Sequence, residues 1–109
     1  MNKQERISSE QKGSVPVFIT DAAYQMKVHD HLVRADATSN VVVLTLPAMA
    51  EAAGMFYHII ATNVTNDVSV FIKETAAEHG SGDFDTADDQ VILFCTGTEW
   101  LDVAASHIT

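Results

Sequence analysis

Short runs of β-branched and aromatic residues, separated by turn-forming residues, recur through most of this sequence. The clearest runs lie at residues 41–46, 55–62, 68–73 and 90–96. Each is too short for a typical helix and has the composition of a strand. Runs of this kind about 8–12 residues apart are typical of sandwiches and barrels, so we expect about seven strands and almost no helix.

The segments between these runs predict the remaining elements. Residues 15–20 form a further run, and Pro16 restricts it to a sheet edge or an extended arm. Apolar and polar side chains alternate over 24–29, which predicts a strand with one wet face that continues over 31–34 past a bulge. Residues 36–40 read as a turn.

Two glycines mark predicted turns. An alanine-rich segment, 48–53, lies between Pro47 and Gly54, which predicts a short helical turn that ends at a glycine of positive φ. Gly97 and Thr98 lie between the runs at 90–96 and 99–104, which predicts a hairpin. Residues 78–89 are expected to form a long polar loop.

The length of 109 residues fits one domain. We therefore expect an all-β single domain, a β-sandwich or a jelly-roll-like barrel, over residues 21–109. Residues 1–20 are expected to form an extended N-terminal arm, because residues 1–14 have no hydrophobic periodicity. A floppy tail is the alternative reading of that segment.

The charge is unevenly distributed. The net charge is −9, yet Lys3, Arg6 and Lys12 outweigh Glu5 and Glu10 in the first twelve residues, which leaves −10 for the rest. An acidic body repels phosphate backbones, so we expect no direct binding of nucleic acid. The sequence has neither an apolar signal region at its start nor a run long enough to cross a bilayer, so we expect synthesis in a cytoplasm and no membrane partner.

A cluster of carboxylates in the polar loop is a candidate calcium site. Asp83, Asp85, Asp88 and Asp89 supply the hard oxygen ligands that calcium prefers. The EF-hand spacing fails, because the sixth position from Asp83 is not glycine and the twelfth is not glutamate. We favour a solvated acidic loop.

Histidines offer a second candidate. His29 and His31 would share one face of a strand and could hold a transition metal if other histidines converged on them. The candidates for that convergence are His58, His79 and His107. We favour two histidines on the polar face, without metal.

Two further groups are candidate catalytic residues. His79, Ser81 and Asp83 lie close in sequence but lack the nucleophile-elbow motif, so we interpret them as a flexible loop. Cys95 lies in an apolar run with no cationic neighbour, so we expect a buried, inert thiol. We therefore expect a protein that is not an enzyme and has no cofactor.

Residues 38–104 contain an ordered series of landmarks: Thr45-Leu46-Pro47, the alanine-rich turn closed by Gly54, the strand-like runs at 56–60, 68–72 and 91–94, and Gly97-Thr98-Glu99-Trp100. This order resembles a β-module of tailed-bacteriophage virion proteins. The pattern is shared by capsid decoration (cement) proteins, head fibres and tail-fibre modules. Thr96 departs from it, since Asp or Asn usually precedes the Gly-Thr.

The resemblance implies a capsid decoration protein that binds the outer capsid surface as a trimer and stabilises the head. Its partners would be the major capsid protein and other copies of itself. The implied capsid-binding arm comprises Lys3, Arg6, Ile7, Lys12, Val15, Val17 and Phe18. The structural landmarks are Leu46, Pro47, Gly54, Gly97 and Trp100. A fibre or receptor-binding module is the main alternative, and an enzyme or metal-binding domain also stays open.

Overall fold

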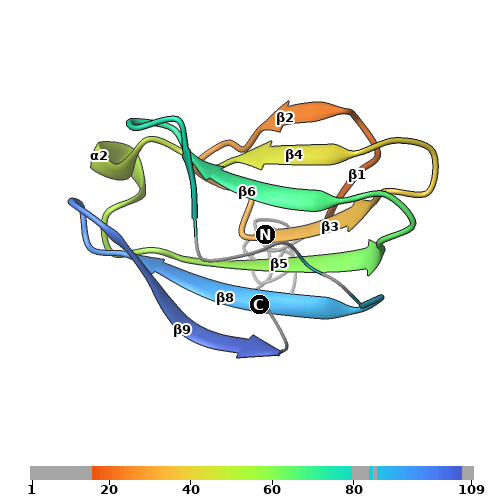
Figure 1. The fold of residues 1–109 in the computed structure, drawn as a ribbon. Helices are drawn as coiled ribbons and strands as arrows, with labels where there is room; N and C mark the ends of the chain where they lie inside the picture. Colours follow the sequence, from red (N-terminus) through yellow and green to blue (C-terminus); the bar gives the residue numbers. More distant parts are fainter. Residues whose placement is uncertain (1–15, 80–83, 85, 107–109) are drawn as a thin grey trace, which may run out of the picture.

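The computed structural model describes residues 16–79, 84 and 86–106, which form two β-sheets and one short helix (Figure 1). The first sheet has the strand order β1-β3-β5-β8-β9, and the second has the order β2-β4-β6-β7. The strands are β1 (Val17–Ile19), β2 (Ala23–Gln25), β3 (Leu32–Asp36), β4 (Val42–Thr45), β5 (Phe56–Asn63), β6 (Val68–Ile72), β7 (Ala77–Glu78), β8 (Asp89–Cys95) and β9 (Trp100–Ser106). The all-β sandwich expected from the sequence is confirmed.

The first six strands alternate between the two sheets along the chain. Each strand therefore lies beside the one two positions later: β1 pairs with β3, β3 with β5, β2 with β4 and β4 with β6, all in parallel. Because the chain crosses to the opposite sheet after each strand, neighbours within a sheet run the same way. The sequence predicted about seven strands, but it predicted neither β7 nor this parallel pairing.

Antiparallel pairs complete both sheets. Strand β8 pairs with β5 and with β9, and the predicted hairpin turns at Gly97, whose φ is 105°. The predicted helical turn is α2 (Met49–Ala52). Gly54 follows it with a φ of 81° and donates its N–H to the carbonyl of Cys95 at 2.7 Å, so this turn is tied to the hairpin. No helix in the described part of the chain is long and apolar enough to cross a membrane.

The core lies between the sheets and follows the alternation of side chains along each strand. In β3, β5 and β8 the inward positions include Val33, Ile59 and Leu93, all fully buried. In β4 and β6 they include Leu44 and Val68. Burial of such side chains contributes roughly 1.5–3 kcal/mol each, which makes this layer the main source of stability.

The strand predicted over 24–29 is wrong beyond Gln25. Asp30 is buried, and its carboxylate accepts bonds from the Tyr24 hydroxyl and the Lys27 N–H, both at 2.8 Å. These bonds hold a turn where the alternating pattern suggested extended chain. After the turn the chain enters the other sheet as β3, so the expected continuation past a bulge is also wrong.

Candidate interaction surface

The outward side of the five-stranded sheet presents three rows of paired residues, here called the outer-face rows. The first row is Phe56, Phe94 and Leu101. The second is Leu32, His58, Ile92 and Ala104. The third is Phe18, Arg34, Ile60 and Gln90. Paired residues in a ladder point to the same side of a sheet, so the three rows form one face.

Large apolar side chains on these rows are open to solvent. Phe18 is 55% exposed, Phe56 53% and Leu101 43%. Phe56 packs beside Phe94, with ring centroids 4.7 Å apart. Contiguous exposed apolar residues on a soluble protein mark a contact surface more often than chance.

The polar members of the rows are held within the face. The Arg34 guanidinium lies 5.8 Å from the centre of the Phe18 ring, within the range of a cation–π contact. His58 Nε2 and Gln90 Oε1 lie 2.6 Å apart. No Asp or Glu belongs to the three rows, although the chain as a whole is acidic; Asp36, two residues after Arg34 on the same side of β3, lies just beyond the third row.

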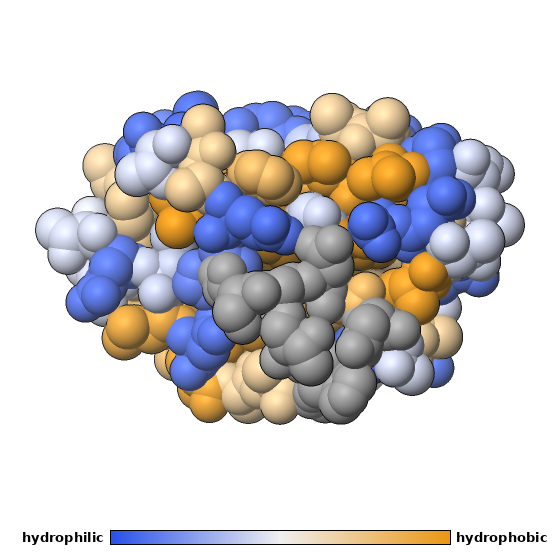
Figure 2. Space-filling model, viewed as in Figure 1, coloured by the Kyte–Doolittle hydropathy of each residue, from blue (hydrophilic) through white to orange (hydrophobic). Residues whose placement is uncertain are grey.

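An open hollow of about 200 Å³ lies over β8 and β9. Gln90, Ile92, Ala104 and Ala105 line it. The hollow forms where small alanines of β9 lie beside a larger side chain of β8. Apolar residues gather over the same strands along the lower margin of Figure 2. For comparison, an apolar cavity of about 150 Å³ accepts a benzene molecule, so this hollow has room for one aromatic ring.

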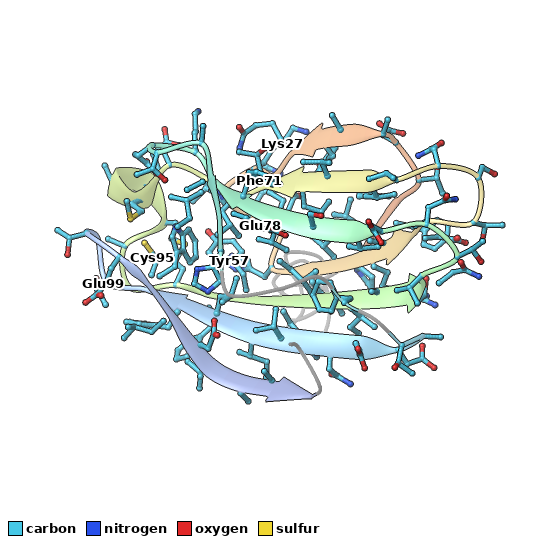
Figure 3. The ribbon with its side chains drawn as sticks, viewed as in Figure 1. Lys27, Tyr57, Phe71, Glu78, Cys95 and Glu99 are labelled. Atoms are coloured by element: carbon cyan, nitrogen blue, oxygen red, sulfur yellow. The ribbon has the colours of Figure 1, made fainter. Side chains whose placement is uncertain are left out.

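The outward side of the four-stranded sheet is different in character. One of its rows runs Gln25, Thr45, Phe71 and Glu78, so most of that row is polar or charged. Phe71 and Glu78 are labelled on this sheet in Figure 3. The exposed apolar rows are thus a property of the five-stranded sheet and not of both faces of the sandwich.

Behind the outer face, an aromatic cluster fixes one end of the core. Tyr57 is fully buried, and its hydroxyl donates to the carbonyl of Val28 at 2.6 Å. Its ring stacks on the His31 ring, with the ring centroids 4.8 Å apart, and makes an edge contact with the Trp100 ring, with the centroids 5.6 Å apart. Burial raises the pKa of Tyr57 to about 12, with smaller contributions from Cys95 and nearby carboxylates. Figure 3 shows Tyr57 and Cys95 at the same end of the sandwich.

The predicted structural landmarks belong to this core. Leu46 and Pro47 are buried at the end of β4, and Trp100 is 6% exposed. The indole N–H of Trp100 has no hydrogen-bond partner among the described residues. Gly54 and Gly97 have the positive φ values that their turns require.

The predicted capsid-binding arm divides between described and undescribed residues. Lys3, Arg6, Ile7, Lys12 and Val15 lie outside the described residues. Val17 and Phe18 lie in β1, the edge strand of the five-stranded sheet. Val17 is partly buried against the core, whereas Phe18 points outward onto the outer-face rows.

The histidines are dispersed over the fold. His29 is exposed in the turn before β3, and His31 stacks on Tyr57, so the prediction that they share a strand face is wrong. His58 belongs to the outer-face rows, and His79 Nε2 lies 2.6 Å from Asp102 Oδ1. Within the described ranges, no group of three or more His, Cys, Asp or Glu side chains could hold a metal ion.

The structure describes part of the acidic loop, and it describes the cysteine. Asp83 and Asp85, with Ser81 and His107, lie outside the described residues. Asp88 is exposed at a φ of 73°, but Asp89 is only 5% exposed, so the prediction of a solvated loop is wrong at Asp89. Its carboxylate accepts a hydrogen bond from the Thr86 N–H at 3.0 Å. Asp89 is the first residue of β8, where it faces the core. Cys95 is buried and free, as predicted.

The outer-face rows were missed by the sequence analysis, although a signal existed. No outward face was predicted for the apolar run from Val91 to Phe94, yet successive residues of a strand point to opposite sides. In a sandwich with one core, half of such a run must face outward. The same holds for Phe56 and Ile60 in β5.

Comparison with protein-family models, with curated proteins and with solved structures found no match for this chain.

Proposed function

We propose that this chain is a viral structural protein, a decoration protein that binds the outer surface of a capsid and other copies of itself. The observation that supports a binding role is the outer-face rows, which expose Phe18, Phe56 and Leu101 together on one side of the molecule. The sequence resemblance to bacteriophage virion modules supports the capsid as the target. It also implies a trimer on the capsid.

The proposed mechanism is mechanical. A capsid filled with DNA is under outward pressure, and it fails where its subunits separate. A bound clamp adds interface energy at each of these seams, and many clamps act on one shell. A contact of standard size, about 1,600 Å² in total, is sufficient for stable binding, and several linked contacts raise the effective affinity further.

The charge distribution supports a division of labour within the chain. The first twelve residues carry a net +1 on an otherwise acidic chain. In this proposal they contact an acidic stretch of the capsid surface.

Deletion of residues 2–14 tests this proposal. We expect the shortened chain to keep the strand-rich circular dichroism spectrum of the full chain and to lose attachment to purified capsids in co-sedimentation. The same capsids decorated with full-length protein should resist heat better than bare ones. Full attachment of the deleted chain would contradict the role of the segment.

A charge-matched pair of variants sharpens the test. The double change Lys3→Gln with Lys12→Gln should weaken attachment. The control, Lys27→Gln with Lys73→Gln, removes exposed positive charge from the sandwich and should leave attachment unchanged. Equal loss in both would mean that total charge, and not the N-terminal segment, governs binding.

A fibre or receptor-binding module is the second candidate, favoured by the exposed aromatic rings of Phe18 and Phe56. Aromatic faces of this kind can bind the apolar side of a sugar ring. A glycan array separates the two functions, because a capsid clamp should bind no glycan on it.

A further inference from the structure

We propose that the outer-face rows are a self-association surface, on which a second copy of this chain packs sheet against sheet about a twofold axis along β5. The proposed function relies on this surface for a binding role, and the present proposal names its occupant. It is argued from the geometry and charge of the sandwich, and it replaces the trimer that the resemblance implies with a twofold pair. Capsid binding can fail or hold separately.

Charge favours a second copy at this face. Each copy carries a net charge of −9, so two copies repel one another over most approaches. The outer-face rows contain no carboxylate, and their one fixed cation, Arg34, lies over the Phe18 ring. Sheet-to-sheet contact over these rows leaves the carboxylates of both copies, including Asp36 beyond the third row, at or outside the margin of the interface, where water solvates them.

The strand order makes the face suited to a twofold pair. Strand β5 is the middle of five strands, with β1 and β3 on one side and β8 and β9 on the other. A twofold axis along β5 therefore places β3 of one copy over β8 of the other, and β1 over β9. On the axis itself Phe56 and Ile60 each meet their own counterpart, while Leu32 meets Ile92 of the second copy.

The same operation places a protruding ring over the hollow. Phe18 lies in the third row at the β1 edge, and the hollow lies beside that row at the β9 edge. Under the twofold axis the Phe18 ring of each copy comes over the hollow bounded by Ile92 and Ala104 of the other. The hollow of about 200 Å³ is large enough to receive it. Two such insertions are formed for each pair of copies, as an isologous interface requires.

The available area sets the expected strength. Five strands about 4.8 Å apart span about 24 Å, and three rows cover about 20 Å along the strands. The face therefore offers about 500 Å² per copy, or about 1,000 Å² in total, which is near the lower limit for a specific interface. We expect a dimer that dissociates on dilution and not an obligate one.

Sedimentation velocity of the purified full-length chain over a wide concentration range tests the proposal. We expect a monomer–dimer equilibrium. Phe56→Asp places two carboxylates face to face on the axis and should raise the dimer dissociation constant at least about thirtyfold, as expected for a hot-spot residue. Val41→Asp is the matched control, because Val41 is 42% exposed but lies outside the rows, and it should leave the constant within about threefold.

A charge exchange tests the predicted contact between Phe18 and the hollow. Phe18→Lys and Ala104→Glu should each weaken the dimer, and the double variant should dimerise more tightly than either single variant, because the new charges meet across the axis. Circular dichroism of each variant identifies any that fail to fold, and the other site then still supplies the test.

A monomer at every concentration, a trimer, or a dimer as sensitive to Val41→Asp as to Phe56→Asp would overturn the proposal. A monomeric chain that still decorates capsids refutes self-association and leaves the capsid-binding part of the proposed function intact, whereas a dimer that never binds capsids refutes only the capsid-binding part.

Discussion

The hydroxyl of Tyr57 provides a sharp test of how the core is held together. Tyr57→Phe keeps the ring, and therefore its stack on His31 and its edge contact with Trp100, but removes the 2.6 Å hydrogen bond to the carbonyl of Val28. A net hydrogen bond contributes about 0.5–1.5 kcal/mol, and a carbonyl left unpaired adds to the loss. We expect the variant to lose about 1–2 kcal/mol of unfolding free energy at pH 7.

The pH dependence of that loss is diagnostic. The pKa of Tyr57 is raised from 10.0 to about 12, so the unfolded chain releases this proton before the folded chain does. The stability contributed by the protonated hydroxyl is fully present below pH 10 and is lost as the pH rises through 12. Two pKa units correspond to about 2.7 kcal/mol, and because the hydrogen bond from the hydroxyl to Val28 is only partly buried, screening by water reduces the expected fall to about 1–2 kcal/mol.

Urea denaturation at several pH values between 7 and 12 measures this effect. The wild-type curve should fall more steeply above pH 10 than the curve of Tyr57→Phe. Burial and the hydrogen bond to Asp30 also raise the pKa of Tyr24. The Tyr57→Phe variant therefore keeps the part of the pH dependence that Tyr24 causes, and the Tyr24→Phe control measures that part separately. Parallel curves of unfolding free energy against pH for the wild type and Tyr57→Phe over pH 10–12 would refute the reasoning. An unfolding free energy of Tyr57→Phe equal to that of the wild type at pH 7 would refute it as well.

Two further predictions concern buried groups. Trp100→Ala should destabilise the fold by about 3–5 kcal/mol in urea denaturation, because it leaves a cavity beside Tyr57. Trp100→Phe should cost less than half as much, since it also removes an indole N–H that lacks a partner among the described residues, and equal losses would contradict that explanation. Asp30→Ala should cost about 2–3 kcal/mol, because the Lys27 N–H and the Tyr24 hydroxyl lose a buried acceptor. A loss below about 0.5 kcal/mol, measured in the same way, would mean that water replaces the carboxylate in this turn.

The strands with the strongest composition could be predicted from the sequence. The run that became β4 is rich in valine and ends at Pro47, and the run that became β8 ends at the Gly97 turn; both signals are local, so one sequence contains them. Turn glycines were predicted for the same reason, because a positive φ strongly favours glycine at a single position.

The pairing of strands could not be predicted in the same way. Whether β3 joins β1 and β5, or continues from β2, depends on a turn set by the carboxylate of Asp30 six residues after Tyr24. The alternating pattern over 24–29 gives no sign of that bond. For the outer face, the information was present in the apolar runs of β5 and β8. To use it, one must apply the rule that successive residues of a strand face opposite sides of the sheet.

The alternation of strands between sheets gives the molecule a layered organisation. Each of the first three layers is a pair of strands, one from each sheet, and each layer bonds only to the next, as in a quasi-one-dimensional repeat protein. Among the described strands, the terminal layer, β1 with β2, has three residues in each strand and a neighbour on one side only. It can therefore detach while the layers beyond it stay folded, and its amide hydrogens should exchange with solvent long before those of β5. Local fraying of this layer would carry Phe18 away from the sheet without unfolding the chain.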